Sequence, residues 1–537
     1  MSKITRRGFL EAGLGALAVG LTNSTPVLGG KRKRPNILMI VADDLGFSDL
    51  GCYGSEIQTP NLDKLASRGM RFTQFYNCAV CNVSRVAMLT GVNPRFGKPN
   101  LLRENMVTIA EVLKEAGYAT SMSGKWHLGG HPTTPNDRGF QEYYGSMIGA
   151  MNYFDPTLPD PPFVHHSGPK HPFVHNDTVI TSVPDGYYST DAFTSHAVDQ
   201  IRKFSREDKP FFLHLAYNAP HYPMQAPADE IAKHRGRYDK GYLDLRQRRH
   251  EGLIRQKIIS DKWTLPAPDK KLGNWRYDLE PEVWESIVDK KWEIEKMEVY
   301  AAMVERMDYG VGRVLKALKD NGVEENTIIV FFSDNGGCAS DIPSTDEKYA
   351  EYRAYNKGKK AGGKDTYVFC GPGWAAAQSS PFRRYKTWTY EGGLSTPMIV
   401  SWKGKIERGT MTDAVGHLVD LMPTFLDICS VKYPSEYNGN SILPVEGVSL
   451  KDVLFGKKPG RERELGWYLY GSRAYRIGKW KLVWGVTARK WELYDMETDR
   501  TETHDLSSAN ADIVRKLTES WTKWAARSQV PLKSQNA

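Results

Sequence analysis

The sequence predicts an α/β fold: a doubly wound, mostly parallel sheet flanked by helices, with a smaller C-terminal α+β domain that contains an antiparallel sheet. Three observations support this. Continuous apolar runs, typical of strands buried on both faces, recur at 37–42, 211–217 and 328–332. Helical segments alternate with these runs. From about residue 465 the pattern changes to short strands separated by turns.

Several helices have recognisable signals. Thr59 followed by Pro60 predicts a helix start with Thr59 as the N-cap. Thr108 and Glu111 have the spacing of a capping box at the start of another helix. An apolar stripe at helical spacing over 300–318 predicts a third, with the stripe facing the core. Helices between apolar runs are the connections that a parallel sheet requires.

Other stretches show little periodicity. Two inserts, at 136–188 and 338–380, are interpreted as irregular, and loops of that length are usually functional or disordered. The run 235–257 is dense in Arg and Lys, and we interpret it as a solvated face.

Length and composition limit the possibilities. The chain has 537 residues, which predicts two unequal domains, at 35–460 and 461–537. Hydrophobic residues make up 40% and charged residues 25%, a globular balance. The net charge of +9 is modest for this length and predicts no nucleic-acid partner. Six scattered cysteines indicate no disulfide framework.

Residues 1–30 are predicted to be an export signal. Arg6-Arg7 and the residues around it resemble a twin-arginine signal. The apolar stretch 12–21 that follows is too short to span a bilayer. The sequence therefore predicts a periplasmic or secreted protein without a stable membrane anchor.

Residues capable of chemistry follow the predicted strands. Asp43 and Asp44 end the first apolar run, and two carboxylates at the end of a buried strand are costly unless a cation neutralises them. The other strand ends supply further candidates: Lys125, His127, His221, Asp334 and Asn335. Carboxyl ends of the strands of a doubly wound sheet face one crevice. A lone Lys is usually solvated and a lone His is often a core residue, but their joint placement favours a site.

The segment Cys81-Asn82-Val83-Ser84-Arg85 precedes an apolar run that ends at Gly91, as a short buried helix would. A helix that begins near Ser84 would point its free N–H groups and positive dipole end at Cys81. Such a terminus is an anion site. A nucleophile there suits attack on a negatively charged ester.

Cys81 has other interpretations. Cys78 and Cys81 have the spacing of a redox pair. They could be half of a zinc site, but the chain contains no second Cys-x-x-Cys. A free cysteine is also often a small buried hydrophobe.

The segment resembles the type I sulfatase signature, Cys-x-Pro-x-Arg followed by Leu-Thr-Gly, with Val83 where that family has Pro or Ala. Further blocks match in order: Asp43-Asp44, Gly124-Lys125-Trp126-His127, Ala219-Pro220-His221, Asp334-Asn335-Gly336-Gly337, Lys386 before Glu391-Gly392-Gly393, and Trp491-Glu492-Leu493-Tyr494. The resemblance covers nearly the whole mature chain. It is closest to the bacterial arylsulfatase-like branch of the alkaline phosphatase superfamily.

The resemblance implies a function and a set of roles. Cys81 would be converted to formylglycine by a generating or maturase enzyme, and its hydrate would be the nucleophile. One Ca²⁺ would be held by Asp43, Asp44, Asp334 and Asn335. Arg85 and Lys125 would hold the hydrate, and His127 would take the proton that lets the covalent sulfate leave. His221 and Lys386 would bind sulfate oxygens, and one of them would protonate the leaving alcohol.

The leading hypothesis is a secreted sulfatase that hydrolyses aryl or carbohydrate sulfate esters, with a sulfated small molecule or polysaccharide as its partner. One alternative is a sulfatase-fold binding protein without turnover, because Val83 could prevent modification of Cys81. Another is a phosphodiesterase or phosphonate hydrolase of the same superfamily, against which the Lys386 block weighs. Val83 is β-branched, so it is expected to favour an extended backbone in its segment.

Overall fold

The computed structural model describes residues 34–97, 102–164, 172–273, 277–340, 346–460 and 462–531. The chain from Arg34 onward forms one compact unit. The predicted export signal, residues 1–30, lies outside the described residues. Among the described residues, no helix has the length and apolar character needed to cross a bilayer.

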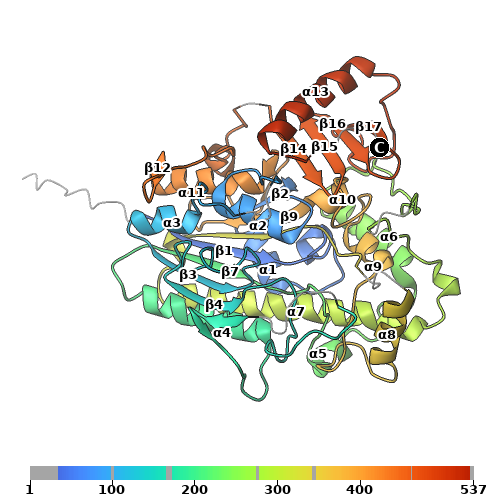
Figure 1. The fold of residues 1–537 in the computed structure, drawn as a ribbon, viewed down its shortest axis with the longest axis horizontal. Helices are drawn as coiled ribbons and strands as arrows, with labels where there is room; N and C mark the ends of the chain where they lie inside the picture. Colours follow the sequence, from blue (N-terminus) through green and yellow to red (C-terminus); the bar gives the residue numbers. More distant parts are fainter. Residues whose placement is uncertain are drawn as a thin grey trace, which may run out of the picture. The chain divides into compact units, whose positions relative to one another are not determined.

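The core of this unit is one large sheet with the strand order β10-β2-β9-β8-β1-β7-β3-β4-β5-β6, in which β11 also pairs with β2 (Figure 1). The strands β8, β1, β7, β3 and β4 pair in parallel, whereas β9 and the β5–β6 extension pair antiparallel. The bounds are β1 (Asn36–Ala42), β2 (Met70–Tyr76), β3 (Ala119–Gly124), β4 (Glu142–Ser146), β5 (Phe173–His175), β6 (Thr178–Val179), β7 (Phe211–Ala216), β8 (Thr327–Ser333), β9 (Ser395–Ser401), β10 (Thr410–Thr412) and β11 (Gly416–His417).

Helices cover both faces of this sheet (Figure 1). One face carries α2 (Cys81–Thr90), α3 (Ile109–Glu115) and α11 (Leu421–Cys429), and the other carries α1 (Pro60–Ser67), α4 (Ser189–Phe204) and α7 (Lys290–Asp320). The alternation along β1 explains the two layers, because Met39 and Val41 join one core cluster while Leu38 and Ile40 join the other. All are fully buried, as predicted for a strand covered on both faces.

A second sheet follows near the C-terminus. Its antiparallel strands are β14 (Glu464–Leu469), β15 (Ser472–Ile477), β16 (Trp480–Gly485) and β17 (Lys490–Asp495), and α13 (Ala511–Arg527) packs on them. Trp467 Nε1 donates to the Asn77 carbonyl at 2.9 Å, which joins this sheet to the loop before α2. The predicted fold class is therefore confirmed. The domain division between residues 460 and 461 stays a prediction.

The two inserts contain more regular structure than the sequence indicated. The first contains β4, β5 and β6, and the second contains α8 (Asp346–Asn356) and α9 (Pro372–Gln378). Their strands and helices are short, so too few residues repeat to show a period. The remaining short elements are α5 (Ala228–Ala232), α6 (Gly241–Arg255), α10 (Glu391–Leu394), α12 (Lys451–Leu454), β12 (Glu436–Tyr437) and β13 (Asn440–Ser441).

The interpretation of the basic run 235–257 as a solvated face is wrong for two of its arginines. Arg246 and Arg249 lie on α6 and are 3% and 1% exposed. Arg249 forms ion pairs with Asp49 and Glu56, which come from the loops after β1. A buried charge needs such partners, and partners about 200 residues away in sequence leave no local signal.

The predicted start of α1 is confirmed, with Thr59 at the N-cap and Pro60 as the first helical residue, but the Thr59 side chain makes no capping hydrogen bond. Asp308, on α7, accepts from the backbone N–H groups of Asn61 and Leu62 at 3.1 and 2.8 Å. A carboxylate from a neighbouring helix thus satisfies donors that the first turn of α1 leaves free. The capping box of Thr108 and Glu111, in contrast, is present.

Candidate active site

The ends of β1 and β8 bring four polar residues together at the carboxyl edge of the sheet. Asp43 and Asp44 follow β1, and Asp334 and Asn335 follow β8, the parallel neighbour of β1. The Asn335 amide nitrogen lies 2.6 Å from Asp44 Oδ1, and the Asp44 N–H donates to Asp334 Oδ1 at 3.5 Å. None is more than 1% exposed. The structure therefore brings all four predicted metal ligands together.

These residues fit a hard cation. Asp43 Oδ1, Asp44 Oδ2 and Asn335 Oδ1 are buried and have no hydrogen-bond partner among the described residues. Buried polar atoms are costly unless they are satisfied. Ligand atoms of Asp43, Asp44 and His221 also lie within 4.8 Å of one another. Carboxylate and amide oxygens are the donors that Ca²⁺ prefers, so the set is a possible calcium site.

The helix α2 begins at Cys81, three residues before the predicted start near Ser84. Val80 is its extended N-cap, and the Ser84 N–H donates to the Val80 carbonyl at 3.0 Å. Cys81 therefore lies in the first turn, whose N–H groups lack helical acceptors. Gly91 ends the helix with φ 67°, as predicted.

Val83 is helical, not extended as its β-branched side chain suggested. Its side chain is 5% exposed and packs in the same core cluster as Val86. Packing of this side chain outweighs the preference of valine for extended backbone. That preference is weak because it depends on neighbouring side chains more than on the backbone itself.

The redox-pair and zinc alternatives for Cys78 and Cys81 receive no support from the geometry. All six cysteines are free and buried. Cys78 Sγ lies 3.8 Å from His417 Nε2, and burial raises the pKa of Cys78 to about 12. A thiol that does not ionise near neutral pH is a poor redox partner for Cys81.

Arg85 lies one helical turn after Cys81 and therefore on the same face of α2. Its guanidinium donates to Asp334 Oδ2 at 2.8 and 3.1 Å and to the Lys125 carbonyl at 2.6 Å. Burial lowers the pKa of Arg85, but Asp334 and Asp43 raise it by more, so the net shift is upward. Arg85 is a fixed cation next to the nucleophile position.

The loop after β3 places Lys125 and His127. Lys125 Nζ contacts Asp43 Oδ2, and His127 Nδ1 lies 3.3 Å from Cys81 Sγ. The His127 N–H donates to the Met147 carbonyl, which fixes this loop to the end of β4. Burial, followed by the charge of Lys125, lowers the pKa of His127 well below its usual value. A neutral imidazole at this position can accept a proton.

The loop after β7 places His221 against Asp44. His221 Nε2 lies 3.5 Å from Asp44 Oδ2, and Nδ1 donates to the Tyr222 carbonyl at 2.6 Å. The His221 ring also packs on the Tyr222 ring, with a centroid distance of 4.2 Å. Burial lowers the pKa of His221 to about 4, although Asp44 opposes the shift.

Lys386 completes the predicted set. Its ammonium lies 2.5 Å from Asp44 Oδ1, and its backbone N–H donates to the Gly337 carbonyl at 3.0 Å. The next residue, Thr387, donates to the Ala79 carbonyl, two residues before Cys81. Burial lowers the pKa of Lys386, but Asp44 and the other acidic groups around it together outweigh burial and raise the pKa well above its usual value. All ten sequence-predicted site residues therefore lie in one cluster.

The backbone around this cluster is strained. Asp44, Ala79, His127 and Thr387 have φ between 60° and 78°, a left-handed conformation that residues with a side chain rarely adopt. Strain of this kind persists where the surrounding structure over-determines it, and such places are commonly functional sites.

The sequence did not predict the residues that hydrogen-bond to the backbone and neighbours of this cluster. The Tyr300 hydroxyl donates to Asp49 Oδ2 at 2.7 Å and to the Asp44 carbonyl at 3.3 Å. Arg249 pairs with Asp49 in turn. Tyr300 belongs to the apolar stripe of α7, so helical periodicity marked it only as core.

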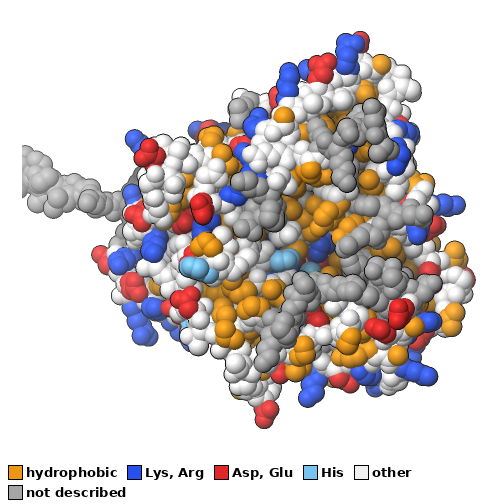
Figure 2. Space-filling model, viewed as in Figure 1, with side chains coloured by type: hydrophobic (Ala, Val, Ile, Leu, Met, Phe, Trp, Pro, Cys, Tyr) orange, Lys and Arg blue, Asp and Glu red, His pale blue; other side chains and the backbone are white. Residues whose placement is uncertain are grey.

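Sequence reasoning also missed an aromatic cluster beside His221. Tyr222 packs on it, with ring-centroid distances of 4.9 Å to Phe369 and 6.4 Å to Tyr367. We name this cluster the aromatic wall, and its buried members are Phe163, Tyr352, Tyr367 and Phe369. Figure 2 shows histidine and basic atoms near the centre of the face in view, bordered by hydrophobic side chains. The inserts thus supply an apolar border to a charged site.

Comparison with known proteins agrees with this geometry. The family model described as sulfatase matches residues 35–431, and the model for the C-terminal part of N-sulphoglucosamine sulphohydrolase matches residues 383–527. An uncharacterised sulfatase of Schizosaccharomyces pombe is 34% identical, with coverage of 93% of this chain and 94% of that protein. An arylsulfatase of Klebsiella aerogenes is 32% identical, with coverage of 84% and 98%.

Solved structures show the same fold. The crystal structure of Ps i-CgsB in complex with k-i-k-neocarrahexaose is 28% identical, with a TM-score of 0.65 and coverage of 93% of this chain and 94% of that chain. The matched family model, the relatives above and this structural similarity lead to one conclusion. The chain belongs to the sulfatase family and is a sulfuric-ester hydrolase.

Proposed function

We propose that this sulfatase removes sulfate from a carbohydrate, with a formylglycine made from Cys81 as its nucleophile and one Ca²⁺ as its cofactor. One observation supports the proposed cofactor. Three buried oxygens, on Asp43, Asp44 and Asn335, lack hydrogen-bond partners among the described residues. Bound there, Ca²⁺ supplies positive charge to the nucleophile and to a sulfate oxygen.

The charges of the cluster support an anionic substrate. Three carboxylates, on Asp43, Asp44 and Asp334, are in contact with three cations, on Arg85, Lys125 and Lys386. These charges cancel, so a divalent cation would make the site positive by two. A buried positive site attracts a sulfate ester far more strongly than one exposed to water.

The side chains have distinct tasks in this proposal. Arg85 and Lys125 orient the oxygen that replaces Cys81 Sγ, and His127 accepts and returns a proton at that oxygen. His221 and Lys386 bind the sulfate oxygens. The negative charge of a bound sulfate ester raises the pKa of His221, so that its ring takes up a proton and delivers it to the leaving alcohol. The 3.3 Å distance from His127 to Cys81 Sγ supports this division, since His221 contacts Asp44 instead.

The aromatic wall and Tyr222 support a carbohydrate as the leaving group. Ligand pockets combine apolar contact with a few fixed polar groups. Here the aromatic faces provide the apolar contact, and the adjacent charged site provides the polar groups. The i-CgsB structure holds a neocarrahexaose. Phe369→Ala is therefore expected to raise KM for a sulfated oligosaccharide while p-nitrophenyl sulfate turnover changes little.

One pair of measurements tests the reaction. Mass spectrometry of the Cys81 peptide should show formylglycine, and the same preparation should hydrolyse sulfate esters faster than matched phosphate esters. Turnover with wholly unmodified Cys81 would mean another nucleophile. Preference for phosphate diesters would favour the phosphodiesterase alternative.

The metal is tested separately. Chelation followed by dialysis should remove most of the turnover, and Ca²⁺ should restore it. Asp334→Ala should reduce turnover more than chelation does at saturating substrate, because Asp334 also holds Arg85. Full turnover after exhaustive chelation would disprove the calcium assignment.

The twin-arginine resemblance of residues 1–30 supports export of the folded protein to the periplasm or beyond. Such a route would let a maturase modify Cys81, and Ca²⁺ bind, before export. Cell fractionation of the native chain beside an Arg6→Lys/Arg7→Lys variant tests this. Equal export of both chains would contradict it.

A further inference from the structure

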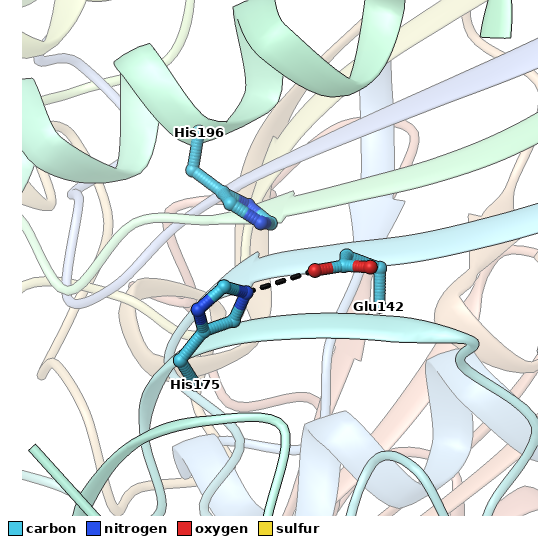
Figure 3. Close-up of side chains that lie close together, drawn as sticks. All are labelled: Glu142, His175 and His196. Carbon is cyan, nitrogen blue, oxygen red and sulfur yellow. Dashed lines mark hydrogen bonds and ion pairs between the residues drawn. The ribbon is translucent and has the colours of Figure 1, made fainter. Parts of the chain in front are cut away.

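A second group of side chains that could hold a metal ion consists of Glu142, His175 and His196, which lie close together (Figure 3). Glu142 comes from β4, His175 from β5 and His196 from α4. One ligand atom from each of the three residues lies within 4.8 Å of the other two. His175 Nε2 is already 2.8 Å from Glu142 Oε1. Three separate elements therefore aim donor atoms at a common point.

Both ring nitrogens of His196 have polar neighbours. Its Nδ1 lies 2.7 Å from Ser123 Oγ, and its Nε2 lies 3.4 Å from the Gln200 amide nitrogen. Whichever nitrogen binds an ion, the other keeps a polar partner, as metal-bound histidines usually do.

Tyr144 restrains both imidazoles. Its ring centroid lies 5.3 Å from that of His196 and 5.9 Å from that of His175. The two imidazole rings are 5.9 Å apart and nearly perpendicular. Ligands whose rings are fixed by packing lose little freedom when they bind an ion.

We propose that Glu142, His175 and His196 bind a divalent transition-metal ion of the zinc type, with water as a fourth ligand. Two imidazoles and one carboxylate are a ligand set that Zn²⁺ uses, whereas Ca²⁺ prefers oxygen donors alone. The only described cation that pairs with this cluster, Lys203, lies 3.7 Å from Glu142 and is 56% exposed. Its flexible side chain can turn into solvent when an ion binds.

The location separates this site from the catalytic one. Glu142 lies at the amino end of β4, whereas the catalytic residues follow the carboxyl ends of β1, β3, β7 and β8. An ion there would join the β4–β5 pair to α4. The carboxyl end of β4 leads to Met147, whose carbonyl accepts the His127 N–H. The ion would therefore stabilise this edge of the sheet without contacting a catalytic residue.

The test uses the full chain without an affinity tag, stripped of metal and then titrated with ZnCl₂ in excess Ca²⁺. Calorimetry should show one Zn²⁺ equivalent that His175→Ala removes. Glu142→Gln should weaken binding at least tenfold, because it replaces a charged ligand with a neutral one. Co²⁺ in place of Zn²⁺ should give the visible absorption of a low-coordinate site, and His175→Ala should abolish it.

His131→Ala is the matched control. His131 is 83% exposed and pairs with Asp137, like His175 with Glu142, but no third ligand joins that pair among the described residues. This control should keep the Zn²⁺ equivalent. Aryl sulfate turnover of His175→Ala should stay at the wild-type level, which shows that the variant is folded. Absence of Zn²⁺ binding by the wild type, or equal stoichiometry in His175→Ala, would overturn the proposal.

Discussion

His127 and His221 contact different partners, and this difference separates their expected effects. Loss of His221 should lower kcat/KM most for leaving alcohols of high pKa, because those need a proton. The loss should reach about 10²–10⁴-fold for such substrates. Loss of His127 should lower turnover by a similar factor for every leaving group, since this residue acts at the nucleophile. Steady-state kinetics of His127→Ala and His221→Ala on a series of aryl sulfates measures both.

Lys386→Ala is the matched control for His221→Ala. A lysine acts as a compact point charge, so its removal should weaken every substrate by the same factor through the shared sulfate group. Identical profiles for His221→Ala and Lys386→Ala across the series would show that His221 is not the general acid.

Under the proposed function, Val83 is expected to affect the processing of Cys81 and not the finished site. Its N–H contacts the neighbouring Asn82 side chain and has no helical acceptor, because Val83 lies in the first turn of α2. Proline is tolerated there. Val83→Pro should therefore keep the fold, raise the fraction of modified Cys81 in a foreign host, and raise activity in proportion. Peptide mass spectrometry beside sulfate-ester turnover tests this, and full modification of the wild type in that host would contradict it.

At the scale of elements, Asp308 connects α7 to α1. Its carboxylate accepts three hydrogen bonds, two from Asn61 and one from Leu62. Asp308→Ala should cost about 2 kcal/mol of the free energy of unfolding, the loss of a charged helix cap. Urea unfolding measures this. Asp320→Ala, an exposed carboxylate on the same helix, should change it by less than about 0.5 kcal/mol. Equal costs would disprove the capping role.

The same carboxyl predicts a pH dependence. Burial raises the pKa of Asp308 from 3.8 to about 6, so the folded state binds its proton more tightly than the unfolded state. Stability from this group is therefore greatest below pH 3.8 and declines as the pH rises to about 6. The stability advantage of wild type over Asp308→Ala should shrink over that interval and stay constant above it. An advantage that grows with pH would contradict the assignment.

Whether an element could be predicted from the sequence depended on how close in sequence the residues that determine it are. The strand β1 was predictable because a strand covered on both faces must be apolar throughout, and the topology then places Asp43 and Asp334 at one edge. The capping of α1 by Asp308 was not, since the partners are about 250 residues apart in sequence. The strand β4 was missed because only five residues form it. The burial of Arg249 was not predicted, because its carboxylate partners are about 200 residues away in sequence.

At the scale of the whole molecule, a buried ion cluster joins the C-terminal sheet to the site. It consists of Glu391, Lys481, Arg500 and Glu502, none more than 1% exposed. Lys481 Nζ lies 2.8 Å from one carboxylate oxygen of Glu391 and 2.8 Å from one of Glu502, and Arg500 binds the other oxygen of Glu391 at 2.8 Å. Glu391 follows Lys386 by five residues. The C-terminal sheet thus supports the segment that carries Lys386, the lysine that we propose binds sulfate.

The two carboxyl groups of this cluster differ in the direction of their pKa shifts. This difference predicts that one substitution should partly restore the stability that another removes. Burial raises the pKa of Glu391, but Lys481 and Arg500 lower it by more, to about 2. Burial raises the pKa of Glu502 to about 7 despite Lys481. Lys481→Met should therefore cost about 3–5 kcal/mol of the free energy of unfolding, because it leaves buried charge uncompensated.

Adding Glu502→Gln to Lys481→Met should recover part of that loss. Glu391 keeps Arg500, whereas the Glu502 carboxylate, whose only cationic partner among the described residues is Lys481, is replaced by a neutral amide. Urea unfolding of both single variants and the double variant gives the coupling free energy. Lys479→Met is the control, because its pair with Asp495 is 41% exposed on the lysine side, so solvent screens it and its loss should change stability little. Strictly additive effects would mean that Lys481 and Glu502 act independently, and the C-terminal sheet would then support Lys386 through packing alone.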